Sequence, residues 1–137
     1  MVTGRPLVPG EASGRLLRLT HPISFWGGVD PVAGEIVDPR HPQFGARLAG
    51  RVLAIPSAVG SSSSSAIMLE LLREGTAPAA ILMGRADAIL ALGAVVAGEL
   101  GYDTIPIVEV DPEVMASIPD GSTVDVRSDG SVVTRDD

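Results

Sequence analysis

A glycine followed by five serines, residues 60–65, is the stretch of this sequence whose residue types could do chemistry. An apolar run at 52–55 precedes it and a helical apolar pattern follows it, the order expected of strand, tight loop and helix. A helix that begins here directs unpaired backbone N–H groups and a positive dipole end at the loop. The first acidic residue after the serines is Glu70, more than one turn into the predicted helix. We therefore expect the helix start to be available to bind an anionic ligand or to stabilise a serine alkoxide.

A purely structural role for this segment also stays open. Serine runs are common in linkers, and serine is a frequent N-cap. The apolar, periodic segments on both sides favour a structured loop over a linker. A phosphate-binding loop of the Walker type is excluded, since no Gly-Lys-Ser/Thr follows the glycine and the chain contains no lysine.

The second candidate segment, residues 21–31, combines large aromatic rings with two consecutive glycines. Such rings can simply anchor a glycine-rich loop to the core. The functional alternative is a loop that presents Ser24, Trp26 and the backbone amides of Gly27 and Gly28 at a pocket wall or interface.

A third group, Asp38, Arg40 and His41, lies in the polar loop that follows a short predicted strand at 35–37. These side chains can form a solvated turn. They also include groups able to bind a carboxylate or donate a proton, so a binding role stays open.

Composition excludes several classes of protein. The chain has 137 residues, of which 45% are hydrophobic, so we expect one compact domain spanning 1–137, with a loosely specified lead-in at 1–11. Without cysteine, it can form neither disulfides nor thiolate ligands, and its two histidines do not sit at a zinc-site spacing. Ten scattered arginines and a net charge of −7 disfavour nucleic-acid binding. No apolar stretch of membrane-spanning length and no secretory signal is visible, so the expected location is cytoplasmic.

The elements that position these candidates follow from periodicity and breakers. We predict βαβ units over 52–110, because apolar strands at 52–55, 79–83 and 105–110 alternate with helices ending at Gly75 and spanning 86–100. Further strands are predicted at 15–19 and on both sides of the Asp-Gly turn at 128–130, and residues 111–113 are predicted to open a short helix. The fold class is therefore α/β or β/β/α, with a mixed, partly parallel or barrel-like sheet, flanking helices and a C-terminal β-hairpin.

Five motifs together resemble a known family. They are P-I-S-F-W-G-G-V-D-P (22–31), G-E-I-V-D-P-R-H-P-Q-F-G (34–45), L-A-G-R-V-L-A-I-P-S (48–57), G-S-S-S-S-S (60–65) and A-P-A-A-I-L-M (77–83). In this order they resemble the small subunit, or swivelling domain, of the aconitase X family, over roughly residues 11–110. The likeness implies a β/β/α swivelling domain.

The resemblance also implies a function and a site. Family members are hydro-lyases, and split-chain forms pair a small swivelling subunit with a large one carrying cysteine-ligated iron. We therefore expect a heterodimer or higher assembly in which this chain binds no cofactor and the large subunit holds an iron or iron–sulfur centre as Lewis acid. The expected substrate is a small hydroxy acid, first cis-3-hydroxy-L-proline and alternatively 5-phosphomevalonate. Ser61 matches the family's proton acceptor, and the expected substrate-binding residues are Gly60, Ser62, Ser63, Ser24, Trp26, Gly27 and Gly28.

Two positions depart from the family pattern. Val59 stands where many relatives have Lys or Arg, and Ser64 where a glycine is usual. Losing a basic side chain weakens the case for a phosphorylated substrate, since phosphate recognition favours Arg or Lys. A non-catalytic partner-binding module, whose Gly/Ser loop only docks, is the alternative from another class.

Overall fold

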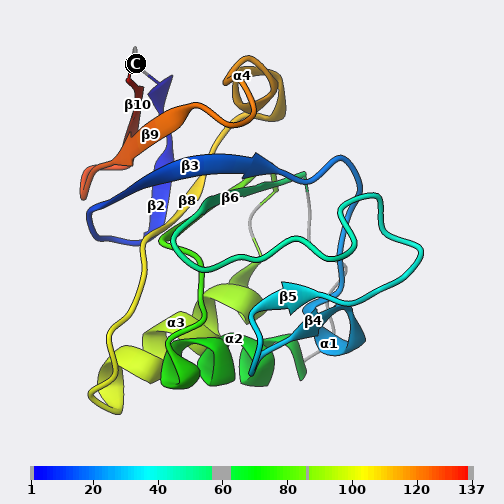
Figure 1. Cartoon of the computed structure of the whole chain (residues 1–137). Coiled ribbons are helices and arrows are strands. Elements are labelled where there is room, and N and C mark those ends of the chain that lie inside the picture. Colours follow the sequence, from blue (N-terminus) through cyan, green and yellow to red (C-terminus); the bar gives the residue numbers. More distant parts are fainter. Residues whose placement is uncertain (1, 57–62, 86, 136–137) are drawn as a thin grey trace.

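The computed structural model describes residues 2–56, 63–85 and 87–135 (Figure 1). The strands are β1 (Val2–Thr3), β2 (Arg5–Val8), β3 (Ala12–Arg18), β4 (Val29–Asp30), β5 (Glu35–Ile36), β6 (Val52–Ile55), β7 (Ala80–Met83), β8 (Ile107–Glu109), β9 (Thr123–Val126) and β10 (Ser131–Thr134). The helices are α1 (Phe25–Gly28), α2 (Ser63–Glu74), α3 (Ala88–Glu99) and α4 (Pro112–Ala116).

The main sheet is mixed and nearly closed, in the strand order β1-β10-β9-β3-β6-β7-β8-β2. Strands β3, β6, β7 and β8 are parallel to one another, whereas β9, β10, β1 and β2 join by antiparallel pairing. The predicted βαβ units are confirmed, because α2 links β6 to β7 and α3 links β7 to β8. The predicted C-terminal hairpin is also confirmed as β9 and β10. The expected fold class is therefore correct.

The sheet separates two apolar cores. Alternate residues of β6 point to opposite faces, so that Leu53 and Ile55 pack under the helices while Val52 and Ala54 pack inside the barrel. This burial on both faces explains why the central strands read as continuous apolar runs. Helices α2 and α3 cover one face of the sheet, and α4 lies on the other (Figure 1).

Residues 1–11 differ from the expectation of a loosely specified lead-in. They contain β1 and β2, which lie at opposite ends of the strand order and are divided at Gly4. Strand β1 pairs with β10 and β2 pairs with β8, so this segment draws the two sides of the sheet together. The sequence does not reveal this, because each partner lies about a hundred or more residues along the chain.

Helix ends follow the expected local rules. Gly75, at φ +74°, ends α2, and the Thr76 N–H donates to the Leu71 carbonyl at 3.0 Å. The Asp111 carboxylate accepts from the Glu113 N–H at 2.9 Å and caps α4, with Pro112 at the first helical position.

Candidate functional site

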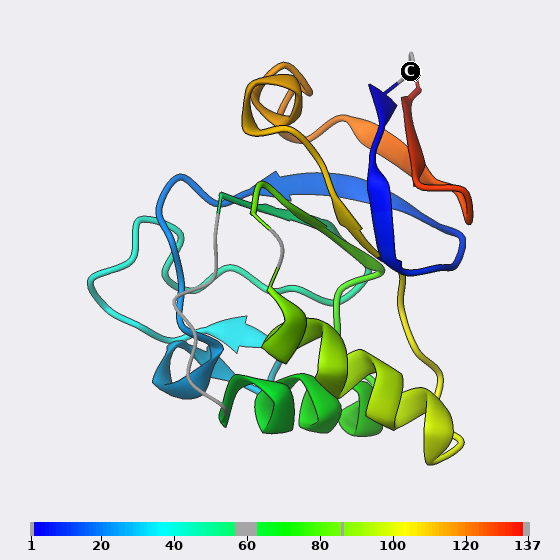
Figure 2. The same ribbon diagram turned by 180° about the vertical axis from the view of Figure 1, so that it is seen from behind.

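The two candidate segments leave the same edge of the sheet. Strands β3 and β6 are parallel neighbours, with Leu17 opposite Leu53, and the segments that follow them start at their carboxyl ends. This is the edge of an α/β sheet at which ligands usually bind. Helix α1, which follows β3, contacts α2, which follows β6 (Figure 2). The fold therefore brings the twin-glycine segment next to the helix that begins after the serine loop.

The serine loop itself is only partly described. Ser63 is half-buried at the start of α2. Gly60, Ser61 and Ser62 lie outside the described residues, as does Val59. The proposed role of Ser61 as proton acceptor therefore stays a prediction.

In the segment 21–31, one aromatic ring anchors the loop to the core and the other is presented at the surface. Phe25 is completely buried in the core under the helices and anchors the segment. Trp26, the next residue, is 59% exposed and is presented outward. Anchoring and presentation thus operate together in α1.

The two glycines of α1 are in different environments. Gly27 has a φ of +81°, a left-handed conformation that side chains disfavour. At Gly28, a Cβ would lie 3.2 Å from Cγ1 of Ile23, closer than most side-chain contacts. Beyond them the Val29 N–H donates to the Phe25 carbonyl, which closes the turn.

An open depression of about 450 Å³ joins this segment to the loop after β5. Strands β4 and β5 pair with Val29 opposite Ile36, and the Val37 N–H donates to the Gly28 carbonyl at 2.9 Å. This pairing places the two loops side by side. The depression is lined by Ser24, Trp26, Gly27, Gly28, Asp38, Pro39 and Arg40.

Arg40 supplies the positive charge of the depression. Its side chain is 91% exposed, and its Nε lies 3.4 Å from Oδ1 of Asp38. The backbone N–H of Arg40 donates to the same carboxylate at 3.0 Å and is the main reason that the pKa of Asp38 is lowered. Asp38 therefore stays ionised and holds the loop, while most of the guanidinium faces solvent.

His41 has a structural role in this loop. Its ring is buried, and its Nδ1 accepts from the Gln43 N–H at 3.0 Å. Since Nδ1 is an acceptor, Nε2 carries the proton and donates to the His21 carbonyl, 3.1 Å away. With both nitrogens engaged by backbone, His41 holds the loop rather than offering a proton to a substrate.

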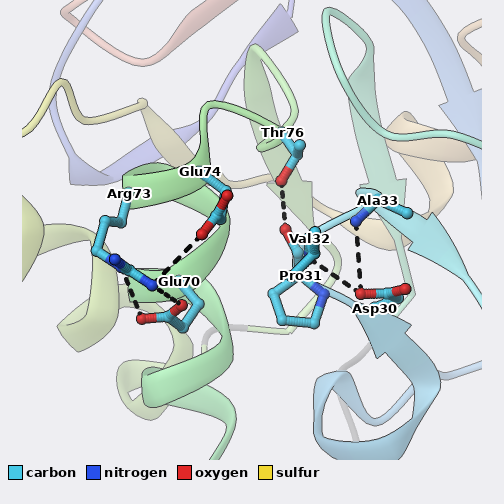
Figure 3. A network of polar contacts seen from close by, with 8 residues as sticks. All are labelled: Asp30, Pro31, Val32, Ala33, Glu70, Arg73, Glu74 and Thr76. Carbon is cyan, nitrogen blue, oxygen red and sulfur yellow. Dashed lines mark hydrogen bonds and ion pairs between the residues drawn. The ribbon is translucent and has the colours of Figure 1, made fainter.

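Polar contacts fix the turn between β4 and β5 to the end of α2 (Figure 3). The Asp30 carboxylate accepts from the N–H groups of Val32 and Ala33 at 3.0 and 3.4 Å. Thr76 follows Gly75, the glycine that ends α2, and its hydroxyl donates to the Pro31 carbonyl at 2.6 Å. The strands that carry the walls of the depression are therefore tied to the helix that follows the serine loop.

Ser64, the second of the two departures named from the sequence, lies in the first turn of α2. It is completely buried, and its hydroxyl has no hydrogen-bond partner among the described residues. An unsatisfied buried hydroxyl costs free energy. Among the described residues, the first turn of α2 therefore holds a buried polar atom without a hydrogen-bond partner.

The chemistry of the described residues does not include a metal centre. Across residues 2–56, 63–85 and 87–135, no group of three or more His, Asp or Glu side chains is placed to hold a metal ion. Within the same ranges, no helix combines the length and apolar character needed to cross a bilayer.

Three residues line the depression in addition to four that the sequence predicted for the site. Asp38, Pro39 and Arg40 line the depression together with these four predicted residues, although the sequence left the group around Arg40 open between a solvated turn and a binding role. The sequence signal that could have identified them is the pair of short strands on either side of Gly34. The pairing of these strands places the loop after β5 next to α1.

Known proteins resemble this chain in sequence and in structure. The family model of the aconitase X swivel domain matches residues 1–134. A cis-3-hydroxy-L-proline dehydratase from Pseudomonas aeruginosa is 51% identical over 107 residues, which are 78% of this chain and 18% of that protein. A phosphomevalonate dehydratase small subunit from Thermococcus onnurineus is 38% identical over 131 residues, 95% of this chain and 94% of that one.

The solved structure of aconitase X from Thermococcus kodakaraensis, in its holo-form, has the same fold. It superposes with a TM-score of 0.87 and 34% identity, covering 98% of both chains. The predicted resemblance is therefore confirmed, and the chain belongs to the aconitase X swivel-domain family.

Proposed function

We propose that this chain is the small subunit of a cytoplasmic, heterodimeric aconitase X-type hydro-lyase that removes water from a small hydroxy acid. The first substrate that we propose is cis-3-hydroxy-L-proline. The observation that carries this choice is the 51% identity to the Pseudomonas aeruginosa dehydratase, against 38% to the Thermococcus onnurineus small subunit.

A second polypeptide is part of the proposal. The chain spans only 18% of the length of the Pseudomonas aeruginosa relative, so the remaining functions of such an enzyme have to come from elsewhere. The chain has no cysteine, and its described residues form no metal site. The described residues thus do not fit an iron centre, and we assign the iron or iron–sulfur cofactor to the large subunit.

The part of the reaction that we assign to this chain is proton removal by Ser61. A serine hydroxyl is a poor base near neutral pH unless its alkoxide is stabilised. A helix N-terminus directs backbone N–H groups and a positive dipole end toward the preceding loop, and the first turn of α2 contains no acidic side chain. As an alkoxide, Ser61 would take the α-proton of the substrate and become a hydroxyl again.

We assign the depression beside α1 to one side of the substrate-binding site. A hydroxy acid carries a carboxylate, for which the exposed guanidinium of Arg40 is a suitable partner. Trp26 and the narrow backbone of Gly27 and Gly28 leave room for a small ring next to it. We assign Ser63, together with Gly60 and Ser62, to the loop side of the same site.

Phosphomevalonate is a second candidate substrate, favoured by one observation. The match to the Thermococcus onnurineus phosphomevalonate dehydratase small subunit extends over 95% of this chain and 94% of that protein. Val59 argues against it, since a valine cannot neutralise a phosphate.

The test is an activity assay of the chain reconstituted with its purified large aconitase X-type partner, on both substrates. We expect turnover of cis-3-hydroxy-L-proline, and a loss of about a hundredfold or more in Ser61→Ala, as for removal of a general base. Ser122→Ala is the matched control, because its hydroxyl donates to the Pro119 carbonyl in the turn between α4 and β9.

Two outcomes would contradict the proposal. Turnover of Ser61→Ala within about tenfold of wild type, equivalent to about 1.4 kcal/mol of barrier, would remove the proton-acceptor role. Full activity of the large polypeptide alone would instead make this chain a non-catalytic docking module.

A further inference from the structure

The outer face of α3 is apolar and uncovered. On its inner face Leu90, Ala94 and Ala97 pack into the core. On the outer face Leu92 is 52% exposed and Val95 is 46% exposed. A surface helix normally carries charged or polar residues on this side, but α3 has none before Glu99, its last residue. The fold of the described chain does not use these outward side chains.

A groove between α2 and α3 extends this apolar face. It has a volume of about 220 Å³, and carbon atoms make up most of its lining. Gly93 contributes no side chain to fill it, and the two helices approach so closely there that a Cβ would lie 2.8 Å from Cβ of Met68. The groove is lined by Ser65, Ala66, Leu69, Leu92, Gly93 and Val96.

The charged part of α2 is already matched within the helix. Arg73 lies 2.7 Å from Oε2 of Glu70 and 3.3 Å from Oε1 of Glu74 (Figure 3). These three groups come after Leu69 on the helix, so they follow the apolar groove. A partner bound in the groove would therefore contact mainly apolar atoms, and the nearby charges of α2 are already paired with one another.

We infer that the groove between α2 and α3, with Leu92 and Val95 at its outer side, is the surface on which the large subunit docks through an apolar segment. The inference rests on the proposed function and names the contact that it requires. Apolar, charge-depleted patches of this kind form the centres of stable protein interfaces.

Position favours the large subunit over a second copy of this chain. The groove includes Ser65 and Ala66, in the first turn of α2, directly after the loop that holds the proposed proton acceptor. A partner that contacts this loop to complete the active site would also contact the groove, because both lie at the start of α2. In the Pseudomonas aeruginosa relative the matched stretch is 18% of the protein, so the body that accompanies the domain is much larger than the domain.

The test measures the affinity of the purified chain for the purified large polypeptide, together with the activity of the pair. We expect Leu92→Glu and Val95→Lys each to weaken binding at least tenfold, because either charge would be buried without a partner. The opposite signs of the two charges exclude a simple effect of net charge. Val114→Glu is the matched control, since this valine is 37% exposed on α4, across the sheet. It should change the affinity less than twofold.

The isolated variants should unfold at the same temperature as the wild type, since both side chains already face outward. Unchanged affinity of folded Leu92→Glu and Val95→Lys, in a wild-type pair that binds and turns over substrate, would overturn the inference and leave the proposed function standing. A wild-type chain that does not bind the large polypeptide would overturn both. A self-association of the isolated chain that Leu92→Glu abolishes, with pairing unaffected, would assign the groove to a second copy.

Discussion

Helices α2 and α3 occupy equivalent places in the fold but have different outer surfaces. Each spans twelve residues, connects neighbouring parallel strands and packs on the same face of the sheet. The outer side of α2 carries Glu70 and Arg73, whereas that of α3 carries Leu92 and Val95. Since both helices fold on the same apolar core, the core determines their inner faces only. The outer face of α3 therefore carries information about something other than folding.

The contact between the two helices is the first way to test this comparison, and the effect should be the largest. In Gly93→Ala the new Cβ would collide with the Ser65 carbonyl and Cβ of Met68, so we expect a loss of about 1–3 kcal/mol in unfolding free energy. Urea unfolding of the isolated chain measures it.

Gly98→Ala is the matched control on the same helix. Its nearest neighbouring atom, Cγ2 of Thr104, is 3.7 Å from the new Cβ, so the gain in helix propensity should stabilise the chain by up to about 1 kcal/mol. Equal effects of the two alanines would show that the helices separate easily and that the groove is not a rigid surface.

The start of α3 should give an intermediate effect. The Asp87 carboxylate accepts from the N–H groups of Ile89 and Leu90 at 2.9 and 3.2 Å. Asp87→Ala should therefore reduce the unfolding free energy by about 1 kcal/mol, whereas Asp87→Asn should retain most of the cap. Thermal unfolding of both variants checks it, and an equal loss in both would assign the effect to charge instead of capping.

The ion pairs of α2 should give the smallest effect and a defined pH dependence. A hydrogen bond from Arg73 lowers the pKa of Glu70, so this carboxylate stabilises the folded state above its ordinary pKa, and the contribution is lost as pH falls through the lowered value. Glu70→Gln should therefore be slightly less stable than wild type at about pH 7, and the difference should disappear once the pH lies below the lowered pKa of Glu70. A difference that persists in acid would indicate a contact other than the ion pair.

Local patterns in the sequence predicted the central architecture well. The apolar strands, the glycine that ends α2 and the proline that begins α4 are all signals carried within a few residues. The sequence did not predict that the outer face of α3 is apolar and exposed. The small residues of this helix, such as Ala91 and Gly93, indicate close packing without showing which side of the helix is covered. Which side is covered depends on the neighbouring elements, which periodicity does not identify.

The candidate site was predictable only in part. Ser24, Trp26, Gly27 and Gly28 line one depression as grouped, but the sequence did not tell which ring of the aromatic segment is buried. The answer depends on the volume available under α2, where the core holds Phe25. Ser61 was assigned by resemblance, and the chemistry of its loop remains for the activity assay to test.

The pairing of β1 with β10 has a consequence for how such a domain is distributed among proteins. Val2 lies opposite Val132, so the entry and exit of the described chain are neighbours on one side of the barrel (Figures 1 and 2). Such a unit can be spliced to a longer polypeptide at either end, or separated from it, without rearranging its interior. The same geometry thus suits a relative that is a small subunit and a relative in which the matched stretch is a segment of a longer polypeptide.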